Sequence, residues 1–146
     1  MKMNLRPRTL DRILFYAVVL FLLMGMISGS VISKEMDCDI QNTSCTKSLS
    51  GFLVTLDIHP KPVTAMTDLV FTVIIKGEIE GNPPYIDLGM PGMDMGPNRV
   101  HLKEVAEGKY EGTGIIVRCK SGRRTWKATI TIPEKGNVTF QFDVIY

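Results

Sequence analysis

The sequence has few residues of the kinds that carry catalysis. It holds only two histidines and three cysteines among 146 residues. No serine or cysteine has a histidine at the spacing of a nucleophile and its base, and no glycine-rich phosphate loop is present. Cys38 and Cys45 are too far apart for a CxxC redox pair. We therefore expect a protein that is not an enzyme.

The sequence also lacks a basic stripe outside its first segment. Residues 1–32 contain four basic residues and one acidic residue, whereas residues 33–146 contain thirteen basic and fourteen acidic residues. The positive charge excess therefore belongs to the N-terminal segment, and the remainder offers no track for a phosphate backbone. We do not expect nucleic acid as a partner.

One long apolar segment is present, and it contains no charged residue. Residues 13–32 are twenty consecutive uncharged residues, and a helix of this length spans about 30 Å, the thickness of a bilayer's hydrocarbon core. The basic residues before it predict a cytoplasmic N-terminus, residues 1–12, and a periplasmic or extracellular C-terminal part. We predict an uncleaved single-pass transmembrane anchor. The alternative is a signal peptide cleaved near residues 28–30.

Residues 33–50 are polar and show no periodic pattern, which predicts a juxtamembrane linker. An exported position is oxidising, so we expect at least one disulfide. A Cys38–Cys45 bond would close a short loop and stabilise the fold by about 2.5 kcal/mol, whereas a bond from either to Cys119 would contribute about 4.5 kcal/mol. We favour Cys38–Cys45. Cys119 would then be a buried thiol, an intermolecular bridge or a metal ligand.

From Gly51 onward the pattern changes to the two-residue alternation of β-strands, most clearly in residues 126–132. Seven short strands, with no helix long enough for a parallel crossover, predict an all-β, immunoglobulin-like antiparallel sandwich over residues 51–146. A turn at Gly122 would join two of the strands into a hairpin. The expected strands are residues 53–58, 69–76, 85–88, 99–105, 109–119, 124–132 and 138–145.

The most unusual local feature is the Met loop, residues 89–97, with Met90, Met93 and Met95 among two prolines and three glycines. This composition excludes a regular strand or helix. Soft thioether sulfurs suit Cu(I), so the loop could form a three-coordinate site. His101 should face solvent on the next strand and could add a nitrogen ligand. The alternative is that Met90 and one other methionine pack as apolar plugs over the end of the sandwich.

Five basic residues crowd the turn at Gly122. A solvated turn with charged flanks is one explanation, and a docking patch for an acidic partner or for anionic lipid headgroups is the other. We call these residues the basic cluster: Arg118, Lys120, Arg123, Arg124 and Lys127.

Residues 51–146 resemble the FixH/YtkA-like family of small membrane-tethered extracytoplasmic domains. The similar segments are HPKPVTAMTDLVFTVIIKG, the loop MPGMDMG, the strand GKYEGTGIIV and the strand GRRTWKATITI. The resemblance implies a bacterial protein with an immunoglobulin-like fold and a part in copper handling or in assembling copper-containing respiratory oxidases. It also implies Met90, Met93 and Met95 as copper ligands. The sequence departs from many relatives in having no histidine inside the loop.

Two functions follow from these features. The first is a tethered Cu(I) carrier that passes the ion to a membrane-protein partner. The second is a metal-free accessory subunit that docks onto a larger membrane complex through the basic cluster, with the Met loop as an apolar contact. A third, a thiol-redox role for Cys119, requires a lowered pKa for that thiol.

Overall fold

A computed structural model describes Phe15 and residues 37–146 of the chain. The predicted cytoplasmic segment and transmembrane anchor lie outside the described residues, apart from Phe15, which is helical and exposed. Among the residues that are described, no helix is long and apolar enough to cross a membrane. Residues 37–146 form a unit by themselves, with their own apolar core.

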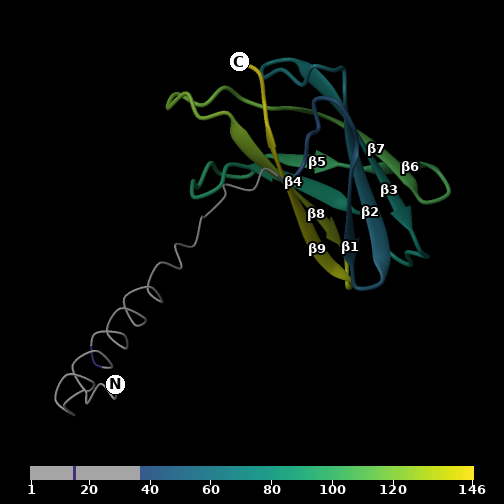
Figure 1. Ribbon diagram of the computed structural model, residues 1–146. Coiled ribbons are helices and arrows are strands. Elements are labelled where there is room, and N and C mark those ends of the chain that lie inside the picture. The colour runs from purple at the N-terminus through teal and green to yellow at the C-terminus, as the bar shows by residue number, and fades with distance from the viewer. Residues whose placement is uncertain (1–14, 16–36) are drawn as a thin grey trace, which may run out of the picture. The chain divides into compact units, whose positions relative to one another are not determined.

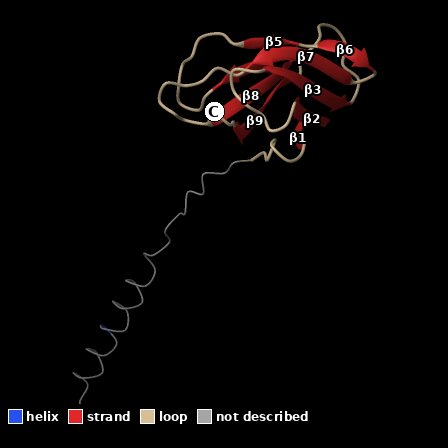
Figure 2. Ribbon diagram, turned by 90° about the horizontal axis from the view of Figure 1, so that it is seen from above, coloured by secondary structure: helices blue, strands red, loops and turns tan. Residues whose placement is uncertain are grey.

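In the described part of the chain, nine strands form two antiparallel sheets (Figures 1 and 2). The five-stranded sheet has the order β1-β2-β3-β7-β6, and the four-stranded sheet has the order β5-β4-β8-β9. The strands are β1 (Cys45–Leu49), β2 (Phe52–His59), β3 (Asp68–Lys76), β4 (Tyr85–Gly89), β5 (Arg99–His101), β6 (Lys103–Ala106), β7 (Lys109–Ile115), β8 (Thr125–Ile132) and β9 (Gly136–Asp143).

The core lies between the two sheets, as the alternating pattern predicts. Trp126 on β8, Phe140 on β9 and Phe71 on β3 are all fully buried, although β3 belongs to the other sheet. Every second residue of β8 is buried and the residues between are half-buried. One apolar face per strand therefore closes a single core, and the prediction of an all-β sandwich is confirmed.

The predicted hairpin of residues 109–119 with 124–132 is wrong. The β7 strand ends at Ile115 and pairs with β3 and β6, whereas β8 pairs with β4 and β9 in the other sheet. The turn itself does form: the amide of Gly122 donates to the carbonyl of Cys119 at 3.1 Å, and Gly122 has a φ of 72°. Ile116, directly after β7, is fully buried. From there the chain passes to the other sheet, where β8 begins. We call residues 116–124 the crossover segment.

The strand predicted over residues 99–105 is divided between the two sheets as β5 and β6. Two glycines of β7 make room for this change of sheet. A Cβ atom on Gly112 would lie 2.3 Å from the carbonyl oxygen of His101, and one on Gly114 would lie 2.6 Å from Cγ2 of Val100. The remaining predicted strands agree with the observed ones to within two residues at each end.

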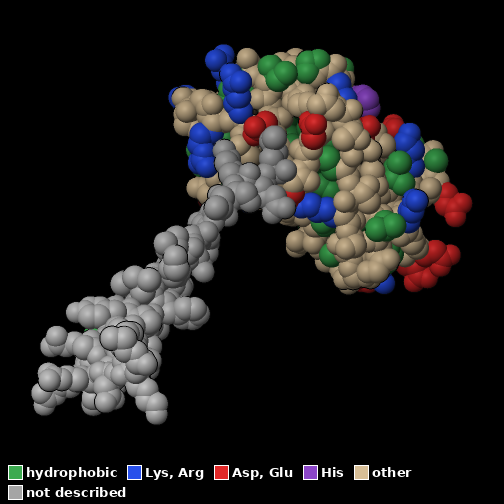
Figure 3. All heavy atoms as spheres, viewed as in Figure 1, with side chains coloured by type: hydrophobic (Ala, Val, Ile, Leu, Met, Phe, Trp, Pro, Cys, Tyr) green, Lys and Arg blue, Asp and Glu red, His purple; other side chains and the backbone are tan. Residues whose placement is uncertain are grey.

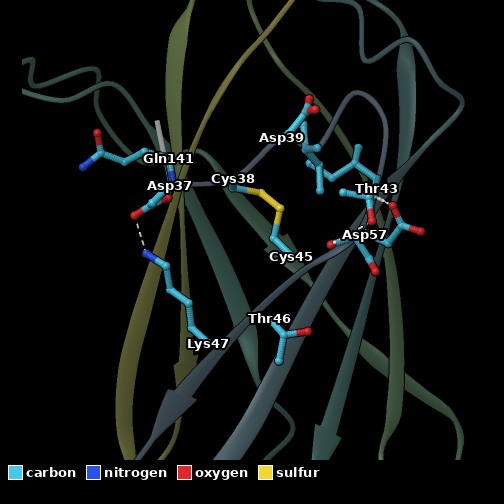
Figure 4. The surroundings of a disulfide bond; sticks show 12 residues. Asp37, Cys38, Asp39, Thr43, Cys45, Thr46, Lys47, Asp57 and Gln141 are labelled. Carbon is cyan, nitrogen blue, oxygen red and sulfur yellow. Dashed lines mark hydrogen bonds and ion pairs between the residues drawn. A yellow bond between two sulfur atoms is a disulfide. The ribbon is translucent and has the colours of Figure 1, made fainter. Parts of the chain in front are cut away.

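Residues 33–50 were predicted to be a linker, but those of them that the structure describes belong to the sandwich. β1 pairs with β2 along its whole length, and Ile40 is fully buried. The disulfide Cys38–Cys45 is present, as predicted, with its Cα atoms 5.6 Å apart (Figure 4). The linker prediction failed because alternation of apolar residues cannot reveal an edge strand whose outer positions are polar.

Side chains of this segment also cover the free edge of β9. Lys47 donates to the carbonyl of Thr139 at 2.6 Å, and Asp37 accepts from the amide of Gln141 at 2.8 Å. Lys47 and Asp37 are themselves ion-paired (Figure 4). Because an uncovered edge strand can pair with another chain, these contacts protect the sheet. We call residues 37–47 the edge clamp.

Candidate functional site

The Met loop and the basic cluster lie at the same end of the sandwich, which we call the Met end. Arg123 of the crossover segment donates from Nη2 to the carbonyl of Pro91 in the Met loop, at 3.1 Å. Asn98, directly after the loop, donates to the carbonyl of Ile115 at 3.3 Å. The first bond joins the crossover segment to the Met loop, and the second joins the residue after the loop to the end of β7. Figure 1 shows both loops at the same end of the sandwich. The two predicted sites are therefore neighbours.

Met90 belongs to the core. Its side chain is 0% exposed, so its sulfur has no contact with solvent. The amide of Met93 donates to the carbonyl of Met90 at 3.2 Å, which closes a turn at the base of the loop. This placement matches the alternative in which Met90 packs as an apolar plug, and it does not suit a ligand that must meet an ion arriving from solvent.

The other two methionines of the loop lie outside the core. Met93 is 37% exposed. Met95 is half-buried against the core and lines a groove of about 750 Å³. We call it the Met groove, and its lining also includes Met66, Asp68, Ile115, Val117 and Trp126.

Met66 is a groove residue that the sequence analysis missed. It lies in the loop between β2 and β3, far from the Met loop in the sequence, and nothing in its spacing connects the two. The only signal in the sequence was a large apolar residue inside a turn rich in threonine and proline.

His101 is exposed, as expected, but it is not close to the methionines. It lies opposite Tyr85 at the start of β4, whereas the Met loop leaves the other end of β4 at Gly89. Four residues of strand correspond to about 13 Å. His101 does not line the Met groove either.

The positive charges of the basic cluster are not neutralised by ion pairs in the described part of the chain. Four are exposed, and Lys127 is half-buried beside Gly89. The guanidinium of Arg118 lies 5.8 Å from the ring centroid of Tyr146. Basic side chains gather around this end in the space-filling view (Figure 3).

Cys119 is the free cysteine, and it is buried in the crossover segment. Its Sγ lies 3.0 Å from the hydroxyl of Ser121. Hydrogen bonds from the hydroxyl and backbone of Ser121 lower the pKa of the thiol, desolvation opposes them, and the charge of Arg123 adds a smaller lowering effect. The direction of the pKa shift agrees with the thiol-redox hypothesis, but burial keeps the sulfur away from a soluble partner.

The usual metal-ligating side chains do not form a cluster among the described residues. No three side chains of histidine, cysteine, aspartate or glutamate gather there in a way that could hold an ion. No family model, curated protein or solved structure matches this chain. The soft sulfur donors at the Met end are the thioethers of Met66, Met93 and Met95 and the buried thiol of Cys119.

Proposed function

We propose that this chain is a membrane-tethered extracytoplasmic protein with an immunoglobulin-like domain that carries Cu(I) at its Met end. The resemblance to the FixH/YtkA-like family supports this function and a membrane-protein acceptor for the ion. The observation that carries it is the position of Met93 and Met95, whose side chains lie outside the core, with Met95 lining the Met groove.

The chemistry of an exported site favours thioethers over thiols. Oxidising surroundings convert exposed thiols to disulfides, and two of the three cysteines are already joined in this way. Methionine keeps a soft sulfur donor without an ionisable proton, and such donors suit Cu(I). Of the four ligands named from the sequence, Met93 and Met95 fit this role, whereas Met90 is buried and His101 is distant.

A competitive anaerobic Cu(I) titration of residues 33–146 tests the function. Changing both Met93 and Met95 to leucine should weaken binding by about tenfold or more, equal to about 1.4 kcal/mol. Met90→Leu is the matched control, because it replaces one buried apolar side chain by another of similar volume. Absence of Cu(I) binding by the unmodified domain would overturn the proposal.

The second candidate is an accessory subunit that docks onto an acidic surface of a larger membrane complex. It is favoured by the basic cluster, which carries uncompensated positive charge beside the Met loop and is hydrogen-bonded to it through Arg123. Basic patches of this kind steer acidic partners toward them.

Charge reversal separates the two functions. Lys120→Glu with Arg124→Glu changes two exposed side chains that make no hydrogen bond or ion pair in the described structure. Under the docking function, native electrophoresis of solubilised host membranes should show this variant moving from a large complex to its own mass, with unchanged Cu(I) affinity. Lys76→Glu with Lys135→Glu, away from the Met end, is the control. A full-length protein that never migrates in a larger complex would exclude docking.

A further inference from the structure

We propose that Met66 is the third thioether of the Cu(I) site, acting with Met93 and Met95 in the place that the sequence assigned to Met90. This inference rests on the proposed Cu(I) function and concerns which residues hold the ion. It starts from the Met groove, because Met66 and Met95 come from separate loops and line it together.

Met66 is held at the groove by its backbone and not by packing of its side chain. Its amide donates to the carbonyl of Ile116 at 2.8 Å, and the next residue, Thr67, donates from its hydroxyl to Thr64 at 2.7 Å. Met66 has a φ of 63°, in the left-handed region that a non-glycine residue adopts only under strong local constraint. The turn therefore fixes where the side chain begins.

The side chain itself remains open to solvent. Met66 is 66% exposed, more than any other large apolar residue of residues 37–146. Met90, in contrast, is 0% exposed. An incoming ion can reach the sulfur of Met66 without opening the core, whereas reaching the sulfur of Met90 would require removing a core residue.

Nearby carboxylates suit a site made of neutral sulfurs. Thioethers leave the charge of Cu(I) uncompensated, so a negative group close by stabilises the bound ion. Asp68 lines the same groove and has no ion-pair partner in the described structure. Asp94, between Met93 and Met95, accepts from the amide of Gly96 at 3.1 Å and is likewise without an ion pair there. Arg123 at Pro91 acts in the opposite direction.

Two spectroscopic signals report Cu(I) binding at this site, and neither requires the protein's function in the cell. Trp126 is the only tryptophan of the chain and lines the groove, so its fluorescence should respond when the ion binds. The methyl groups of ¹³C-labelled methionines should shift in NMR spectra when their own sulfur coordinates. The full-length chain in detergent micelles is titrated with Cu(I) under anaerobic conditions, and with Ag(I) as a redox-stable soft ion.

We expect the methyl signals of Met66, Met93 and Met95 to move together and that of Met90 to stay in place. Met66→Leu should weaken Cu(I) binding about tenfold, as a lost ligand does, and should reduce the fluorescence response of Trp126. Met90→Leu should leave both unchanged. Because Met66 is exposed, its leucine variant should keep the fold, which far-UV circular dichroism and thermal unfolding would verify.

The outcomes distinguish this proposal from the function on which it rests. If Met93 and Met95 respond while Met66 does not, and Met66→Leu binds like the unmodified chain, then Met66 is excluded and the Cu(I) function stands. If Met90 responds in place of Met66, the three methionines of the loop are the site and this proposal is overturned. If no methionine of residues 37–146 responds, both proposals fall.

Discussion

Tyr146 shows how one hydroxyl group can organise the Met end. Its Oη accepts from the indole Nε1 of Trp126 at 3.1 Å and from the amide of Cys119 at 3.3 Å, and it donates to the carbonyl of Arg123. Trp126 is fully buried, so its N–H has no access to water. The Tyr146 hydroxyl thus links Cys119 and Arg123 of the crossover segment to the indole of Trp126 on β8.

Tyr146→Phe should destabilise the domain by about 1–3 kcal/mol, because it leaves the buried indole N–H of Trp126 without an acceptor. Urea unfolding followed by tryptophan fluorescence measures the change. Tyr85→Phe is the control, since no hydrogen bond of the Tyr85 hydroxyl is present in the described structure, and it should change stability by less than about 0.5 kcal/mol. Equal stability of the two variants would show that Tyr146 contributes only its ring.

Asp57 predicts a specific dependence of stability on pH. Burial, the largest influence on this carboxyl, raises its pKa, but hydrogen bonds from Lys61, His59 and the amide of Ile58 together bring the pKa below its ordinary value of 3.8. The folded state therefore holds the proton less tightly than the unfolded chain does. The resulting stabilisation is complete above pH 3.8 and is lost as the pH falls through the lowered pKa.

Asp57→Asn should accordingly lower the free energy of unfolding by about 0.2–1 kcal/mol at neutral pH, the usual range for a solvent-accessible ion pair. The difference from the unmodified protein should shrink below pH 3.8. Urea unfolding at several pH values tests this, with Glu107→Gln as a control because Glu107 has no ion pair in the described part of the chain. A difference that stays constant with pH would contradict the assignment.

At the scale of elements, the edge clamp is the clearest case of a structural role hidden in a polar segment. Lys47, Asp37 and Gln41 satisfy backbone groups along the free edge of β9, and Gln41 reaches the carbonyl of Asp143 at 2.8 Å. The Cys38–Cys45 disulfide closes the loop that carries Gln41, and it joins Cys38, directly after Asp37, to β1, which carries Lys47. The linker predicted from composition therefore completes the sheet.

Replacing Cys38 and Cys45 by serine should cost about 2.5 kcal/mol of stability on the chain-entropy model. It should also speed amide hydrogen exchange at Gln141, because the clamp that covers this edge is then less constrained. Exchange at Val73, in a strand paired on both sides, should change only in proportion to global stability. Unchanged exchange at Gln141 would show that the clamp holds without its disulfide.

At the scale of the whole molecule, one core joins both sheets and the Met end is built on it. The chain passes between the two sheets three times, from β3 to β4, from β5 to β6 and from β7 to β8. Met90 and Trp126 belong to this core, Met95 packs against it, and Trp126 also lines the Met groove. The proposed Cu(I) site is therefore built on the core and not on a loop that is separate from it.

A single core predicts a single cooperative unfolding transition for residues 33–146. Far-UV circular dichroism, which reports on both sheets, and the fluorescence of Trp126, which reports on the four-stranded sheet, should give the same midpoint in urea. Two separate midpoints would mean that the sheets unfold independently, which would contradict the single core.

The sequence by itself predicted the features that depend on neighbouring residues. Alternation in residues 126–132 marked a half-buried strand, Gly122 marked a turn, and the favoured disulfide, Cys38–Cys45, is the one that forms. The strand and the turn follow from local geometry: a side-chain period of two and a positive φ. The two-sheet fold class followed from their repetition.

Only the tertiary structure decided which distant residues meet. Alternation states that a strand has a buried face but not which sheet it joins, so β7 and β8 were paired incorrectly and residues 37–50 were not seen as part of the sandwich. For the same reason the sequence could not separate Met90, which the core takes up, from Met95, or bring Met66 to the same groove. The free energy of burying side chains depends on contacts across the whole chain, and local pattern does not contain those contacts.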